Sequence, residues 1–236
     1  MLLLGFGNKA RHGKDTAAEA IRDYYEKEHD NGLFAPSVKV GIFKFATALY
    51  QEVEDLIGQH GLKSVFNGRF DLPIPRETEI LHGELGDQVV HRTAIRIPSW
   101  VTQGDSTPVP MAKYGKHPKL LQWWGTEYRR NYFGTNYWVD RLFASIPANL
   151  DIAMVSDTRF PNEADGIKQR GGYTVNVQRL REDGTQYYSS DRPVDHPSET
   201  ALDGYNWDFR LLNSAGHREL LQEQAITLAR YLRGKK

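Results

Sequence analysis

The chain has 236 residues, of which 30 are lysine or arginine and 30 are aspartate or glutamate. This length fits one large domain with an insertion, and the balanced charge argues against a nucleic-acid-binding protein. Because the chain contains no cysteine, disulfides and cysteine-ligated metals are excluded. No apolar run approaches the roughly 18 residues of a membrane span, and Met1–Leu4 is too short for a secretory signal. We therefore expect a cytoplasmic protein with no membrane partner.

Residues 2–16 predict a strand, a glycine-containing loop and the start of a helix. Backbone N–H groups in such a loop, here from Ala10 to Lys14, bind phosphate, and the lysine adds a cation. The sequence departs from the strict phosphate-loop pattern at Asn8, where glycine is usual, and at Asp15, where a hydroxyl normally binds magnesium. Asparagine tolerates a positive φ, and a carboxylate also binds this hard cation. The alternative is an ordinary turn between a strand and a helix.

Hydrophobic periodicity predicts the elements around this loop. A helix runs from the loop to about His29, a strand covers 38–46, and a second helix begins at Thr47. The later predicted elements are a helix from Pro161, strands over 173–177 and 207–213, and an amphipathic helix over 220–232. Strands that alternate with helices indicate an α/β protein with a parallel sheet.

One predicted strand, Ile152–Ser156, is a short apolar run followed by Asp157 and Arg159. Such a run is typical of a central parallel strand. In α/β proteins the ligand groups come from the carboxyl ends of the strands, so we expect Asp157 and Arg159 beside the phosphate loop.

The segment 58–150 is interpreted as an insertion that binds the second substrate. Its first part, to about residue 116, is rich in prolines and weak in periodicity, so a passive surface excursion is the alternative. A helix is predicted before Gly125, and aromatic side chains then alternate with arginines. Rings and guanidinium groups are what a nucleotide needs for stacking and for phosphate binding. We therefore predict that Trp124 and Trp138 contact a base, although aromatic residues at helical spacing are more often core.

The segment 180–200 is also set apart, because it is polar and lacks hydrophobic periodicity, which is typical of a mobile flap. It begins next to Arg179 and Arg181 and contains His196. These side chains are candidates to close over phosphates as a lid.

Several motifs carry a family resemblance, and they are Gly13–Thr16, Leu120–Glu127 with Arg130, Asn136–Trp138, Asp157–Arg159, and His196–Glu199 with Asn213. Their spacing resembles that of the phage deoxynucleoside monophosphate kinases over most of the chain and least over 58–116. Asp15 is normal for that group, whereas Asn8 departs from it. Animal phosphomevalonate kinases have similar motifs.

The resemblance implies a P-loop kinase fold, with a five-stranded parallel sheet flanked by helices, that transfers the γ-phosphoryl group of ATP to a deoxynucleoside 5′-monophosphate with Mg²⁺. The ATP-binding residues would be Asn8, Lys9, Ala10, Gly13, Lys14, Asp15, Thr16 and Arg179, of which Asp15 and Thr16 would hold the metal. The catalytic residues would be Lys14, Arg11, Asp157 and Arg159. The acceptor would be bound by Trp124, Arg130, Trp138 and Arg159.

Two other functions compete with this prediction. One is a kinase of the same fold that acts on another phosphorylated small molecule, such as phosphomevalonate or dephospho-coenzyme A. The other is a nucleotide-binding module without catalytic activity. A homodimer is also compatible with the sequence.

Overall fold

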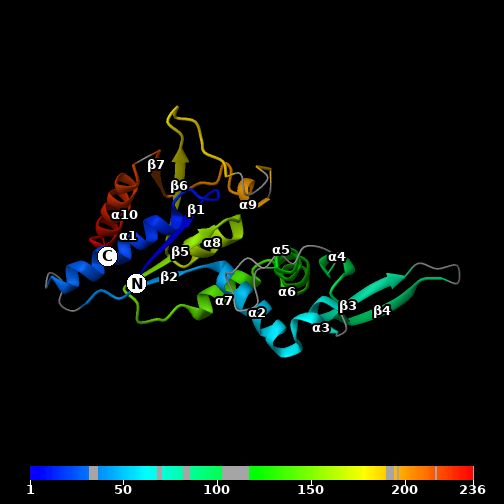
Figure 1. Cartoon of the computed structure of the whole chain (residues 1–236). Coiled ribbons are helices and arrows are strands. Elements are labelled where there is room, and N and C mark those ends of the chain that lie inside the picture. The colour runs from blue at the N-terminus through cyan, green and yellow to red at the C-terminus, as the bar shows by residue number, and fades with distance from the viewer. Residues whose placement is uncertain are drawn as a thin grey trace. The chain divides into compact units, whose positions relative to one another are not determined.

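The computed structural model describes residues 1–31, 37–67, 71–81, 86–102, 117–189, 194–195, 197–215 and 217–235 (Figure 1). The chain forms two compact units, each with a hydrophobic core of its own. The first unit combines Met1–Phe45 with Val139–Lys236, and the second unit is Ala46–Trp138. The second unit overlaps the predicted insertion over 58–150 but begins and ends earlier in the sequence.

A five-stranded sheet in the order β2-β5-β1-β6-β7 organises the first unit. Its strands are β1 (Leu2–Gly7), β2 (Val40–Phe43), β5 (Ile152–Thr158), β6 (Tyr173–Leu180) and β7 (Phe209–Ser214). Every neighbouring pair is parallel, which confirms the predicted α/β class and parallel sheet. The strand predicted over 38–46 is shorter than expected, because helix α2 already begins at Phe45.

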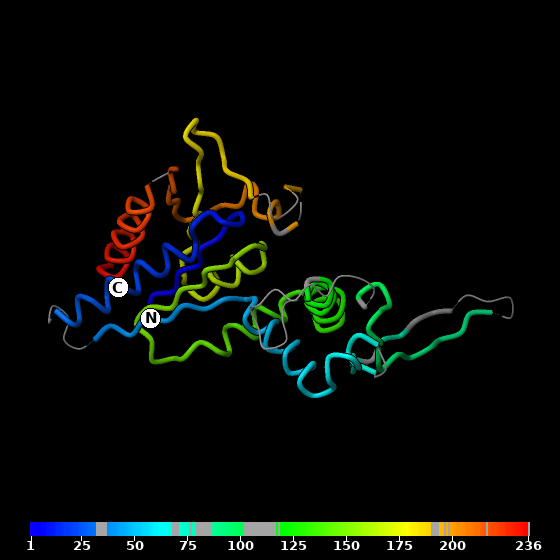
Figure 2. Tube along the Cα trace, in the orientation of Figure 1, coloured from blue at the N-terminus to red at the C-terminus, as the bar shows by residue number. Residues whose placement is uncertain are grey.

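Helices flank both faces of this sheet. The helices α1 (Lys14–Asp30) and α10 (Arg218–Arg233) pack together on one face, as Figures 1 and 2 show, and α7 (Tyr137–Ser145) and α8 (Pro161–Gln169) contribute to the core of the other. Leu2 and Leu4 of β1 belong to the core on the α1 and α10 face of the sheet, and Leu3 belongs to the core on the α7 and α8 face. Because the central strand is buried on both sides, its sequence is a continuous apolar run.

The second unit is mostly helical, with one hairpin. Its helices are α2 (Phe45–His60), α3 (Leu62–Asn67), α4 (Ser99–Thr102), α5 (Pro118–Gln122), η1 (Trp123–Arg130) and α6 (Asn131–Phe133). The antiparallel strands β3 (Leu72–Leu81) and β4 (Gln88–Ile95) form a two-stranded sheet. None of the helices in the described part of the chain has the length and hydropathy of a membrane-spanning segment.

Two features of the second unit differ from the sequence-based expectation. The hairpin was not predicted, because Pro73 and Pro75 obscured the alternation of buried Leu72 and Ile74 in β3, and most described side chains of β4 are exposed. The helix predicted to end before Gly125 instead continues through it as a π-helix, η1. The ideal Cβ position of Gly125 lies 3.2 Å from a methyl group of Leu49, so the glycine allows close packing here instead of ending the helix.

Candidate functional site

The loop between β1 and α1 lies at the carboxyl end of the central strand of the sheet. It leaves the strand at Gly7, where a Cβ atom would lie 2.2 Å from a ring carbon of Trp207. It enters the helix at Gly13, with a φ of 101°. Between them, Asn8 and Arg11 also have positive φ angles, of 107° and 58°. Residues of positive φ between residues of negative φ occur in loops whose backbone N–H groups form anion-binding concavities, so the backbone of this loop is compatible with such a site.

Neighbouring strands hold this loop through side-chain amides. The Asn8 side chain donates a hydrogen bond of 2.7 Å to Oδ1 of Asn176 on β6. The Asn213 side chain on β7 donates one of 2.9 Å to the carbonyl oxygen of His12. The expectation that Asn8 accommodates a positive φ in place of glycine is confirmed, and the bond to Asn176 is a contact that glycine could not make.

Lys14 is buried at the start of α1, and its ammonium group is folded back onto the loop. Nζ donates to the carbonyl oxygen of Asn8 at 3.0 Å and to that of Lys9. Burial, with help from the positive charge of Arg159, lowers the pKa of Lys14 to about 7 against the opposing effects of nearby carboxylates, including Glu199. A bound polyphosphate would favour the charged form of this lysine.

Asp15, the next residue, is held by the ends of two other strands. Its Oδ1 accepts hydrogen bonds from Ser156 Oγ of β5 at 2.7 Å and from Lys44 Nζ, directly after β2, at 2.8 Å. Burial disfavours its ionisation, but the bonds from Lys44 and Ser156 outweigh burial and lower the pKa of Asp15. Lys44 was not predicted from the sequence; the available signal was a basic residue at the carboxyl end of a strand.

The oxygen atoms of Asp15 and Thr16 are of the kind that magnesium binds. Thr16 is half-buried in the first turn of the same helix. The described residues include no group of three histidine, cysteine, aspartate or glutamate side chains that could enclose a metal. Magnesium bound with a nucleotide uses one or two carboxylates and takes its other ligands from phosphate oxygens and water. The Asp15 carboxylate and the Thr16 hydroxyl are therefore suitable ligands for Mg²⁺ bound to a phosphate.

Asp157 lies at the carboxyl end of β5, as predicted, and it makes a structural contact there. Its Oδ1 accepts a hydrogen bond of 2.8 Å from the backbone N–H of Phe45, the first residue of α2. Carboxylates at the start of a helix stabilise its unpaired N–H groups. Asp157 thus holds the backbone N–H of Phe45 within the first unit.

Arg159 also lies beside the loop, as predicted, and two glutamates hold it. Its backbone N–H donates to Glu163 Oε2 at 2.8 Å, and its Nη1 donates to Glu199 Oε1 at 2.8 Å. Glu163 is buried and also accepts from the N–H of Phe160. From the sequence, Glu163 was an ordinary acidic residue of the first helical turn; in the structure it shapes the turn that presents Arg159.

Glu199, in the short helix α9 (Pro197–Thr200), was not predicted as a site residue although it belongs to the His196–Glu199 motif. Its Oε2 accepts a hydrogen bond of 2.7 Å from the N–H of Ala10. The Lys9 ammonium group donates to the Glu199 carbonyl oxygen and forms an ion pair of 2.7 Å with Asp203. The Ala10 amide and the Lys9 side chain, both predicted to bind ATP, are therefore occupied by the α9 segment in this structure.

His12 connects the loop to β6 and to the segment after it. The ring is fully buried, its Nε2 is 2.9 Å from the Tyr187 carbonyl oxygen, and its Nδ1 is 3.2 Å from the N–H of Arg179. Burial lowers the pKa of His12, and the nearby Lys14 adds to this effect. Nδ1 is also 3.1 Å from the Val177 carbonyl oxygen, so three backbone groups surround the ring nitrogens. No pattern in the sequence indicates this role of His12.

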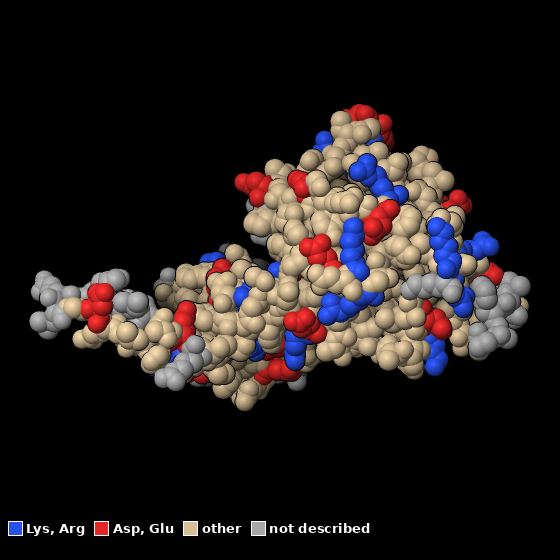
Figure 3. All heavy atoms as spheres, turned by 180° about the vertical axis from the view of Figure 1, so that it is seen from behind, with Lys and Arg blue, Asp and Glu red and all other residues tan. Residues whose placement is uncertain are grey.

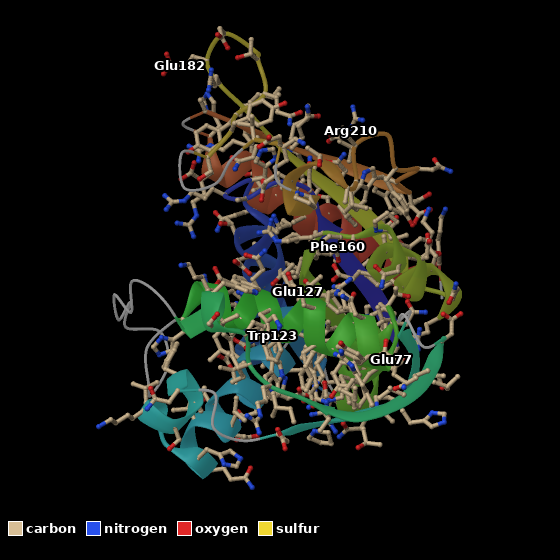
Figure 4. The ribbon with its side chains drawn as sticks, turned by 90° about the vertical axis from the view of Figure 1, so that its right-hand side faces the viewer. Glu77, Trp123, Glu127, Phe160, Glu182 and Arg210 are labelled. Carbon is tan, nitrogen blue, oxygen red and sulfur yellow. The ribbon has the colours of Figure 1, made fainter. Side chains whose placement is uncertain are left out.

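The described residues of the predicted flap over 180–200 include a hairpin and the short helix α9. Residues 181–187 fold back as a hairpin in which the Arg181 N–H donates to Thr185 O at 2.8 Å and the Tyr187 N–H donates to Arg179 O at 3.0 Å. Figure 4 shows Glu182 in this hairpin, beyond the end of β6. The hairpin gives this polar segment defined backbone contacts, its mobility stays a prediction, and His196 lies outside the described residues.

An open pocket of about 430 Å³ lies beside the hairpin, lined by Arg179, Leu180, Arg181, Glu182, Asp183, Tyr187 and Ala215. The Arg179 guanidinium stacks on the Tyr187 ring, 4.2 Å from its centroid. Arg179 Nη1 is also 3.5 Å from the carbonyl oxygen of Arg11, whose own side chain is exposed. The pocket therefore lies beside the β1–α1 loop, because Arg179 both lines it and contacts the loop at Arg11.

Trp124 and Trp138, the predicted base-stacking residues, are core residues of the second unit. They are 4% and 3% exposed. Trp124 Nε1 donates to Glu52 Oε2 at 2.9 Å, and Trp138 Nε1 donates to the Gly125 carbonyl oxygen at 2.8 Å. This burial corrects the interpretation of the aromatic cluster, because a base could stack on either indole only if the packing around it changed.

The arginines of η1 lie beside these aromatic rings. Arg129 Nε donates to the buried Glu52 carboxylate at 2.7 Å, and its guanidinium lies 4.7 Å from the Tyr128 ring centroid. Arg130, predicted to bind the acceptor, is the last residue of η1 and is half-buried. Figure 4 shows Trp123 and Glu127 on the same helix. Arg130 belongs to the second unit and Arg159 to the first, so these two predicted acceptor ligands come from separate parts of the fold.

No protein-family model matches this chain, and a search of curated proteins finds no match. On the face shown in Figure 3, acidic and basic side chains are interspersed over the described residues. The function is therefore inferred from the loop and its surroundings.

Proposed function

We propose that the chain is a P-loop kinase that transfers the γ-phosphoryl group of ATP to a deoxynucleoside 5′-monophosphate. The observation that carries this proposal is the β1–α1 loop, in which buried Lys14 follows residues of positive φ at the carboxyl edge of a parallel sheet. Oriented N–H groups, a helix N-terminus and a desolvated cation favour a bound polyphosphate. Arg159, beside the loop, supplies a further cation for phosphate.

The donor would bind along the loop. The backbone N–H groups from Arg11 to Lys14 would wrap its outer phosphates, and the Lys14 ammonium group would exchange the loop carbonyls for phosphate oxygens. We assign the nucleoside of the donor to the pocket at Arg179 and Tyr187, because His12 links both residues directly to the loop.

Asp15 and Thr16 would hold the magnesium ion that accompanies ATP. Bound there, the metal would neutralise charge on the outer phosphate oxygens. The hydrogen bond from Ser156 orients the Asp15 carboxylate.

In the transfer step, a phosphate oxygen of the acceptor attacks the γ-phosphorus, and the bond between that phosphorus and the β–γ bridging oxygen breaks. ADP leaves and the acceptor becomes a diphosphate. Such transfers depend on alignment and on neutralising charge rather than on covalent catalysis. Lys14 and Arg11 would stabilise the transferring group, and Arg159 would orient the acceptor phosphate.

A second candidate is a kinase of the same fold with a different phosphorylated acceptor, such as phosphomevalonate or dephospho-coenzyme A. The burial of Trp124 and Trp138 supports this candidate, because the prediction of a nucleotide acceptor relied on these two rings to stack on its base. Arg159 would serve any acceptor that carries a phosphate.

An acceptor panel tests the proposal. The full chain is incubated with ATP and Mg²⁺ and with each of the four deoxynucleoside monophosphates, their ribose counterparts, phosphomevalonate or dephospho-coenzyme A, and ADP release is measured. The proposal predicts the highest kcat/KM with a deoxynucleoside monophosphate. Turnover confined to one of the other acceptors would support the second candidate instead.

A further inference from the structure

Glu199 joins three parts of the candidate site. Its side chain is buried, and both carboxylate oxygens are used: Oε2 accepts from the Ala10 N–H of the loop at 2.7 Å, and Oε1 accepts from Arg159 Nη1 at 2.8 Å. Its carbonyl oxygen accepts from the Lys9 ammonium group. One residue of α9 therefore contacts both the phosphate loop and the strand-end arginine.

We infer that Glu199 is a positioning residue for phosphoryl transfer, which fixes the Arg159 guanidinium and the first half of the phosphate loop. This inference rests on the proposed function. A guanidinium group is planar, so a hydrogen bond at one amino nitrogen restricts the direction in which the others point. The Arg159 side chain is 20% exposed, so part of this side chain is accessible to solvent.

The charges around Glu199 are compatible with phosphate binding nearby. A carboxylate by itself would repel a polyphosphate. Here Arg159 contacts the carboxylate directly, and the Lys9 ammonium group contacts the carbonyl oxygen of the same residue. The cations therefore offset the negative charge while the carboxylate retains its orienting role.

The opposite interpretation is that Glu199 occupies the place of a phosphate and is expelled when ATP binds. Expulsion would break both carboxylate contacts and leave a buried acid to find new partners, which is costly. The N–H groups from Arg11 to Lys14 do not need to displace Glu199 to bind phosphate, because its carboxylate takes the Ala10 N–H. The two interpretations predict opposite changes in ATP affinity.

Calorimetric titration of the full chain with ATP and Mg²⁺ distinguishes them. Glu199→Ala removes both contacts and should weaken ATP binding about tenfold, because the loop is no longer held in its binding geometry. Glu199→Gln keeps an acceptor for the Ala10 N–H and should stay within about threefold of the wild type. Asp203→Asn is the matched control from the same segment; it removes an exposed partner of Lys9 and should change affinity less than about twofold. Tighter binding by both Glu199 variants would overturn the inference in favour of expulsion.

The second arm measures turnover with the best acceptor. Glu199→Gln loses the charged partner of Arg159, so kcat/KM for the acceptor should fall at least tenfold while ATP affinity is nearly retained. In an Arg159→Ala background the same change should have almost no further effect, because Glu199 acts through that arginine. Equal effects in both backgrounds, or wild-type kcat/KM for Glu199→Gln, would contradict the positioning role.

The two arms also separate this inference from the proposed function. If the wild type releases no ADP with any acceptor, the kinase proposal fails, while the ATP titrations still decide whether Glu199 supports the loop. If Glu199→Ala does not fold, as judged by its thermal unfolding, the isosteric Glu199→Gln decides through its turnover and through the sign of its change in ATP affinity.

Discussion

The side-chain amide of Asn8 donates a 2.7 Å hydrogen bond to Oδ1 of Asn176, which joins the β1–α1 loop to the neighbouring strand β6. Asn8 has a φ of 107°, a backbone conformation that residues other than glycine rarely adopt. The bond to Asn176 helps to offset this backbone strain. This hydrogen bond is a contact that a glycine at position 8 could not make.

Substitutions of Asn8 test this compensation. Asn8→Gly should change the free energy of unfolding by no more than about 1 kcal/mol, because the relief of strain offsets the lost hydrogen bond. Asn8→Val should cost about 1–3 kcal/mol, since a β-branched residue is strained at positive φ. Urea unfolding measures both, and a valine variant as stable as the wild type would contradict the strain at this position.

The low pKa of Lys14 predicts proton uptake when ATP binds. With a pKa of about 7, the lysine is mostly neutral in the free protein at pH 8. A bound polyphosphate favours the ammonium form and raises the pKa, so binding at pH 8 should take up between about 0.5 and 1 proton. Calorimetry in buffers of different ionisation enthalpy measures this number. Lys14→Met should abolish the uptake, and equal uptake by the variant and the wild type would exclude Lys14 as its source.

Asp15→Asn tests the metal site. The amide keeps an oxygen for the bonds from Ser156 and Lys44 but loses the negative charge that attracts magnesium. The free Mg²⁺ concentration needed for half-maximal activity should rise about tenfold or more. The control is Asp140→Asn on α7, an exposed acidic residue outside the site. An unchanged magnesium requirement for Asp15→Asn would show that other groups hold the metal.

Because the indoles of Trp124 and Trp138 are buried, we expect their substitution to reduce stability and to leave acceptor binding unchanged. Trp138→Phe removes the donor to the Gly125 carbonyl oxygen, and Trp124→Phe removes a donor to Glu52. Each change should lower the free energy of unfolding by about 1–3 kcal/mol and leave the acceptor KM within about twofold. A large rise in KM without a loss of stability would restore the predicted stacking role.

The sequence predicted the parts of the fold that depend on local patterns. The apolar strand Leu2–Gly7 and the helix that begins at Lys14 appear as expected, because a strand buried on both faces and a helix that follows a glycine-containing turn have short-range signatures. The placement of Asp157 and Arg159 beside the loop followed from the rule that parallel strands end at the same edge of the sheet.

The contacts that the sequence missed join distant segments. Glu199 reaches Ala10 across 189 positions, and the buried His12 meets Tyr187 across 175. Periodicity does not encode such pairs. It also could not distinguish a ligand-facing Trp124 from a core one, because both have the same helical spacing. Gly125 was interpreted as a helix end, whereas tertiary packing allows a π-helix to pass through it.

The most direct test of the kinase proposal compares ADP release by the wild type and by Lys14→Met, with ATP, Mg²⁺ and an equimolar mixture of the four deoxynucleoside monophosphates. The wild type should form deoxynucleoside diphosphates in a one-to-one ratio with ADP. The variant should lose activity by about three orders of magnitude or more while its thermal unfolding shows a retained fold. A variant with near-normal turnover, or a wild type that forms no diphosphate, would contradict the proposal.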